Sequence, residues 1–187
     1  MRRARGAKEA ALRPADLTPV ARDVMKGPAS AGLIFASFLA AYLFAVLPWS
    51  GRWLLARPDF VLLLLVFWTL HEPRAVGQGM AFALGLLMDV SDSVLLGQHA
   101  FAYVVAVYGA QVLRVRIVSF HLPEQTLHVL GLTVVASCVM LLLNLLLGAD
   151  FPGFGYFVSP VLTALAWAPA SAILHSQAVR RRREATP

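Results

Sequence analysis

Residues 57–99 read RPDFVLLLLVFWTLHEPRAVGQGMAFALGLLMDVSDSVLLGQH, and this stretch decides the fold. Two apolar runs are joined by the short polar sequence Glu72-Pro73-Arg74. Proline ends a helix, and the charges beside it resist burial in lipid. The pattern therefore predicts two membrane-spanning helices that form an antiparallel hairpin.

Two acidic residues fall at matching places in this hairpin. Asp59 and Asp89 each lie fifteen positions from Arg74. At a rise of ~1.5 Å per residue both are ~22 Å from the turn, near the far edge of a hydrocarbon core ~30 Å thick. Arg57 and Asp92 fall at almost the same depth. Because a lone carboxylate in lipid would cost several kcal/mol, we expect these groups to face protein or headgroup water and to pair, with Arg57 as the nearest cation.

The second run carries small residues at four-residue spacing. Gly77, Ala81, Gly85 and Asp89 form one ridge of a helix, small along most of its length and acidic at its end. Small ridges let helix backbones approach closely in bilayers. The ridge predicts a packing seam, although abundant Ala and Gly can also produce this spacing by chance.

The composition is that of a polytopic membrane protein. Of 187 residues, 59% are hydrophobic and 14% are charged, and the mean hydropathy is +0.70. The basic residues lie mainly in the tails and two short loops, which favours membrane orientation over nucleic-acid binding. The single cysteine, Cys138, excludes an internal disulfide framework.

The chain divides into one membrane domain, residues 29–178, between basic tails at 1–28 and 179–187. The expected fold is an all-α membrane protein with six transmembrane helices. The predicted spans are 29–49, 58–71, 75–90, 95–113, 125–147 and 158–177. The second and third spans are short for a crossing of ~20 residues, so we expect thinning, tilt or ends sheltered by neighbouring helices.

The positive charges predict the orientation of these spans. With six spans, all but two of the 16 Lys and Arg residues, Arg52 and Arg57, lie in the tails or in loops on the same side as the tails. By the positive-inside rule both termini are cytoplasmic. Asp59 and Asp89 then lie at the outer level.

The sequence gives little support for a catalytic site or a metal site. Paired acids in a membrane suggest an aspartic protease, but the local sequences lack the settings that such enzymes use, and Arg57 would keep the acids ionised. A metal site from His99, Asp89 and Asp92 lacks the spacing of ligands on a helix. We therefore expect no enzyme, no cofactor and no metal.

Four short motifs together suggest a family. They are Arg57-Pro58-Asp59-Phe60, Gly77-x-Gly79, Gly85-Leu86-Leu87-x-Asp89 and Leu95-Leu96-Gly97-x-His99. In order and spacing these motifs resemble those of the rod shape-determining protein MreD family. The resemblance covers residues 54–115 in detail and the six-span layout over 29–180 in outline.

The resemblance implies a non-enzymatic inner-membrane scaffold of the bacterial cell-elongation machinery. Its partners would be MreC, the actin-like MreB, the wall synthase RodA and a penicillin-binding protein. The residues add a place of contact, because a single-span partner such as MreC is expected to pack on the ridge that ends in Asp89, beside Arg57, Asp59 and Asp92. Replacement of Asp89 by Leu should then weaken copurification with that partner.

A vitamin-capturing S component of an energy-coupling-factor transporter is the alternative, and we expect the six-helix bundle to be similar in arrangement to that class. Ala36-x3-Ala40 resembles the coupling motif of such proteins. A vitamin site would need several convergent polar groups in long outer loops, whereas the outer loops here are short and poor in such groups. Binding to a vitamin panel would favour the transporter, and copurification with wall-elongation proteins the scaffold.

Overall fold

The computed structural model describes residues 30–49, 51 and 56–184. In these residues all regular secondary structure is helical. Predicted features at residues 1–28 and at Arg52 lie outside the described residues. In chain order the elements are α1 Ala31–Val46, α3 Phe60–His71, α4 Gln78–Ser91, α5 Gln98–Ser119, α6 Leu122–Leu146, the 3-10 turn η2 Phe154–Phe157, α7 Val158–Leu165 and α8 Trp167–Glu184. The predicted all-α membrane fold is confirmed.

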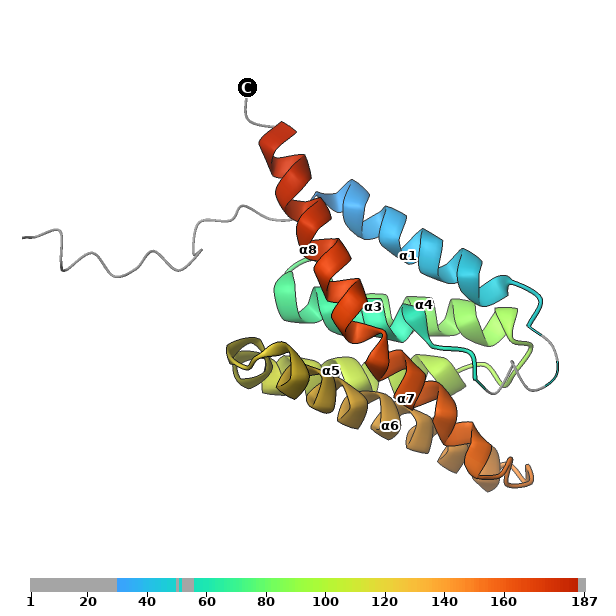
Figure 1. Ribbon diagram of the computed structural model, residues 1–187. Coiled ribbons are helices and arrows are strands. Elements are labelled where there is room, and N and C mark those ends of the chain that lie inside the picture. Colours follow the sequence, from blue (N-terminus) through green and yellow to red (C-terminus); the bar gives the residue numbers. More distant parts are fainter. Residues whose placement is uncertain (1–29, 50, 52–55, 185–187) are drawn as a thin grey trace, which may run out of the picture.

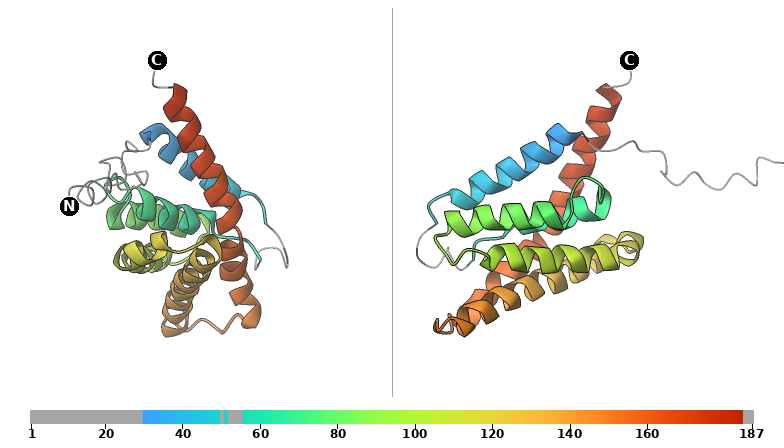
Figure 2. Two further views of the ribbon diagram at one scale, coloured as in Figure 1. Left: turned by 60° about the vertical axis from the view of Figure 1, so that its left-hand side comes forward. Right: turned by 180° about the vertical axis from the view of Figure 1, so that it is seen from behind.

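The helices run up and down in one bundle (Figures 1 and 2). The start of α1 and the end of α8 lie at the same end of the bundle, together with the α3–α4 and α5–α6 connections. The α4–α5 connection and η2 lie at the opposite end. This arrangement is expected of a chain that crosses a membrane an even number of times.

Helix α3 is the centre of the bundle. All ten residues from Val61 to Leu70 are buried, and the helix packs on α1, α5, α6 and α7. A helix that is apolar on every side is stable only inside a protein or a membrane. Its neighbours shelter this helix of 12 residues along its length, and it is shorter than the ~20 residues that a helix needs to cross lipid.

The outward faces of the other helices are apolar. Phe35, Val115 and Leu146 are 68%, 79% and 72% exposed. Three helical segments are long and apolar enough to cross a membrane, namely Gln98–Ser119, Leu122–Leu146 and Phe154–Ser176, and three shorter apolar helices accompany them. The exposed apolar surface is what a bilayer would cover.

The helix bounds differ from several predicted span boundaries. The third helix begins at Gln78 rather than at 75, because the amides of Ala75 and Val76 bond back to the Glu72 carbonyl in a turn. The fourth continues to Ser119 rather than ending at 113, so part of the predicted charged loop is helical. The fifth begins at Leu122 rather than at 125.

The sixth predicted span is two helices. Helix α7 ends at Leu165 and α8 begins at Trp167, with Ala166 between them. Pro169 has no amide hydrogen to bond the Leu165 carbonyl, and its ring would clash with that carbonyl in a straight helix. The break therefore has a local cause in the sequence. Helix α8 then continues to Glu184, into the segment predicted as a tail.

Candidate functional site

The ridge of α4 packs on α5 of the same chain. Ala81, Gly85 and Asp89 are all buried, and α4 and α5 form the most extensive helix pair of the bundle. A β-carbon on Gly85 would come within 2.6 Å of the Ala100 nitrogen. The predicted packing seam is thus present, but the helix that fills it is α5. The expectation that a partner's helix packs on this ridge is therefore wrong.

Asp89 binds the first turn of α5. Its carboxylate accepts hydrogen bonds from the amides of Gly97 at 2.8 Å, His99 at 2.7 Å and Ala100 at 3.4 Å. The His99 ring Nδ1 lies 2.9 Å from the same carboxylate. A helix N-terminus has unpaired amides and a partial positive charge, so it favours an anion. These contacts explain how a fully buried carboxylate is tolerated.

Gly97 makes this arrangement possible. Its φ of +101° lies in the left-handed region, where a side chain would be strained. Gly97 is the N-cap of α5 and turns the chain so that its own amide and those of His99 and Ala100 point at Asp89. Gly77, at the other end of α4, is the N-cap of that helix and has ordinary extended geometry.

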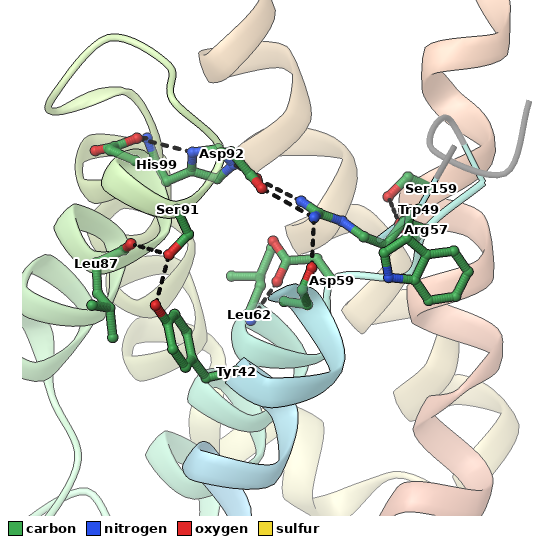
Figure 3. Close-up of polar contacts among 12 residues, drawn as sticks. Tyr42, Trp49, Arg57, Asp59, Leu62, Leu87, Ser91, Asp92, His99 and Ser159 are labelled. Carbon is green, nitrogen blue, oxygen red and sulfur yellow. Dashed lines mark hydrogen bonds and ion pairs between the residues drawn. The ribbon is translucent and has the colours of Figure 1, made fainter. Parts of the chain in front are cut away.

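Arg57 and Asp92 form a two-pronged ion pair (Figure 3). The two guanidinium nitrogens lie 3.0 and 2.5 Å from the two Asp92 oxygens, and the Arg57 side chain also donates to the Ala45 carbonyl at 2.9 Å. The side chains of the pair are 16% and 21% exposed. The sequence-based expectation that Arg57 pairs with an acid at this level is confirmed, and the acid is Asp92.

Asp59 joins three helices at the same end. One carboxylate oxygen accepts the Leu62 amide at 2.9 Å and caps α3, and the other accepts the Tyr103 hydroxyl of α5 at 2.7 Å. The Asp59 amide donates to the Thr163 hydroxyl of α7 at 2.8 Å. The two predicted acids, Asp59 and Asp89, are therefore used to hold helices of this chain together.

These groups line a cavity of about 350 Å³ at this end of the bundle. Arg57, Pro58, Asp59, Asp92 and His99 contribute to its wall. Helices supply further polar groups that reasoning from loops missed, namely Gln98, Thr133, Ser137, Asn144 and Thr163. Tyr103 was missed as well, although it lies four residues after His99 and so shares its helix face.

The cluster does not have the geometry of a metal site. His99 Nδ1 faces Asp89 while Nε2 lies 3.8 Å from Asp92, whose oxygens already hold Arg57. Among the described residues no group of three or more His, Cys, Asp or Glu side chains could hold a metal ion.

A comparison with known families identifies the chain. The family model of the rod shape-determining protein MreD matches residues 29–169. The chain belongs to the MreD family.

A curated MreD-family relative supports this assignment. The rod shape-determining protein MreD of Haemophilus influenzae is 31% identical over 75 residues, which cover 40% of this chain and 46% of the relative. The aligned part spans about half of that relative. No solved structure matches this MreD-family chain, so the expected likeness to S components stays a prediction.

Proposed function

We propose that this MreD-family protein is a non-enzymatic scaffold subunit of the bacterial cell-elongation complex. It binds MreC and, through the complex, links the peptidoglycan synthases RodA and a penicillin-binding protein to MreB. Membership of a family of rod shape-determining proteins carries this proposal. No nucleic acid is involved, because the positive charge follows membrane topology.

We propose that the protein lies in the inner membrane with both termini in the cytoplasm. Arg74, Arg114 and Arg116 belong to the same end of the bundle as the described ends of α1 and α8. Arg57 is at the opposite end, where it is neutralised by Asp92. This charge asymmetry supports the cytoplasmic placement of the termini by the positive-inside rule.

The non-enzymatic reading is supported by the state of the acids. In the described part of the chain no hydrogen bond joins Asp59 to Asp89. Asp59 accepts the Leu62 amide at the start of α3, whereas Asp89 accepts amides at the start of α5. An aspartic protease needs two carboxylates that share a proton. These two are instead committed to structure.

The contact surface for MreC is proposed to be a groove between α1 and α4. This groove has a volume of about 440 Å³ and is almost wholly apolar. The α1 wall includes Ile34, Phe38 and Leu39, and the α4 wall includes Ala83 and Leu87. Because α1 packs on α3 and α4 packs on α5, the facing sides of α1 and α4 leave this space unfilled by their own chain.

A transmembrane helix fits the chemistry of this groove. Apolar walls suit a partner within the bilayer, and the alanines allow its backbone to approach closely. One end is fixed by the Tyr42 hydroxyl, which lies 2.8 Å from the Ser91 hydroxyl and joins α1 to α4 (Figure 3). MreC, as a single-span protein, would supply one such helix.

Two tryptophan variants test this contact. Ala83→Trp fills the groove from α4, whereas Ala36→Trp places the same bulk on an exposed position of α1 outside the groove. Each tagged variant is expressed with MreC of the same organism and purified from membranes. We expect Ala83→Trp to reduce copurified MreC at least tenfold and Ala36→Trp to leave it unchanged.

The failures have distinct meanings. If Ala36→Trp lost copurified MreC while Ala83→Trp retained it, the groove would be rejected as the MreC contact. The proposed scaffold function would still stand. Absence of MreC from purifications of the unmodified protein would reject the scaffold function itself. Equal membrane levels of both variants control for insertion.

A further inference from the structure

The cavity between α3, α5, α6 and α7 has no role in the proposed scaffold contact, which lies on the other side of α4. It opens at the end of the bundle where Arg57, Asp59 and Asp92 gather. Its volume of about 350 Å³ lies within the range of small-molecule pockets. What it holds follows from the groups in its wall.

Three polar side chains of the wall have no partner in the protein. Among the described residues the side chains of Gln98, Ser137 and Asn144 make no hydrogen bond, and the Tyr156 contact at Ser137 is to the backbone carbonyl. Gln98 and Ser137 are each only 6% exposed, so they are removed from bulk solvent. All three border the cavity. Their polar atoms border open space in the cavity, where a ligand would supply the missing hydrogen bonds.

The charged groups of the wall already have hydrogen-bond partners. Arg57 is held by both oxygens of Asp92, and Asp59 accepts bonds from the Leu62 amide and the Tyr103 hydroxyl. A charged ligand would have to displace one of these contacts. The wall groups that have no hydrogen-bond partner are therefore neutral. They are the carboxamides of Gln98 and Asn144 and the hydroxyl of Ser137.

The rest of the wall is apolar or aromatic. Leu62, Met88 and Met140 line the cavity, and the Tyr156 ring lies at its border with its hydroxyl bonded to the Ser137 carbonyl. Carboxamides bind paired hydroxyl or amide groups through a donor and an acceptor each, and an aromatic ring packs on an apolar ring face. This combination suits a sugar-like ring.

We propose that this cavity binds a neutral molecule of monosaccharide size that carries hydroxyl and amide groups. Gln98 and Asn144 provide paired hydrogen bonds, and Ser137 provides a third contact from α6. The proposal does not depend on the binding of MreC. The bound group can be a free solute or the headgroup of a lipid, since both present the same chemistry.

Calorimetric titration of the full-length protein in phosphatidylcholine nanodiscs tests the site. N-acetylglucosamine is the neutral probe, and glucosamine and glucuronate are its cationic and anionic counterparts. We expect saturable binding of N-acetylglucosamine and at least tenfold weaker binding of both charged sugars. Octyl N-acetylglucosaminide is titrated alongside: tenfold tighter binding of the octyl compound identifies a lipid headgroup, and equal binding identifies a free solute.

Variants locate the binding in the cavity. Asn144→Leu should weaken N-acetylglucosamine binding at least tenfold. Ser137→Ala should weaken it at least threefold. Gln111→Leu removes a carboxamide that bonds Gln78 outside the cavity, and it should change nothing. The proposal is overturned if no probe binds saturably, if the charged sugars bind as well as the neutral one, or if Asn144→Leu and Gln111→Leu behave alike. The comparison of probes on the unmodified protein needs no variant to fold.

Discussion

Gly85 of α4 lies directly against the backbone of Ala100 in α5. A β-carbon on Gly85 would meet the Ala100 nitrogen at 2.6 Å and the His99 carbonyl carbon at 2.9 Å. The same approach brings the Asp89 carboxylate to the amides that begin α5. One missing side chain therefore allows both the helix contact and the binding of a buried acid.

Replacement of Gly85 by Ala should destabilise the protein. Backbone atoms cannot move aside as a flexible side chain does, so α4 and α5 must separate, at a cost of ~2 kcal/mol or more. Gly79→Ala is the matched control on the same helix, because no atom lies within 4 Å of its added methyl group. Thermal unfolding in detergent measures the difference. An equal melting temperature for the two variants would contradict the contact.

Replacement of Asp89 by Asn should also lower stability. The neutral amide loses the attraction of the carboxylate for the N-terminus of α5, and it offers one acceptor in place of two, a loss of ~2 kcal/mol. Asp150→Asn makes the same chemical change at an exposed position and should have no effect. The comparison is made by unfolding in detergent. Reduced MreC copurification in an Asp89→Leu variant would not identify a partner contact, because the substitution damages the fold first.

Arg57 and Asp92 should show energetic coupling. In a double-mutant cycle of Arg57→Gln and Asp92→Asn we expect an interaction energy of ~1–3 kcal/mol, because the pair is two-pronged and largely buried. Arg57→Lys should keep the charge but lose most of the coupling, since an ammonium cannot bind both oxygens in the same plane. Additive effects of the single substitutions would show that the pair contributes nothing specific.

The orientation can be tested by labelling in intact cells. The background is Cys138→Ala, which removes the native thiol. In the variants Ser93→Cys and Ala149→Cys the new cysteine should react with a membrane-impermeant maleimide from outside. In Ala75→Cys it should react only after the membrane is opened. Labelling of Ala75 and Ser93 from the same side would contradict the antiparallel hairpin.

The broad fold was predictable because apolar runs, Pro73 and the charge distribution each carry a local signal. Helix rise and the position of the turn were enough to predict that Asp59 and Asp89 lie at one level, and both acids contact the first part of α5. The break at Ala166 was missed, although Pro169 carries the signal for it.

The partner of the small ridge could not be predicted from spacing. A ridge of Gly and Ala shows that some helix approaches closely, and it does not say which one. The answer depends on the turn at Gly97, which brings α5 back along α4. The cavity was not predicted for a related reason, because the polar side chains that it leaves without a partner, Gln98, Ser137 and Asn144, come from α5 and α6 and not from loops.

The central claim is that MreC occupies the groove between α1 and α4 while the seam between α4 and α5 stays closed. Site-specific photo-crosslinking in living cells tests it most directly, with p-benzoylphenylalanine at Met80 in the groove wall and at Val115 on the far, exposed face of α5. The account predicts a crosslink to MreC from Met80 and none from Val115. A crosslink from Val115 alone, or from neither position, would contradict it.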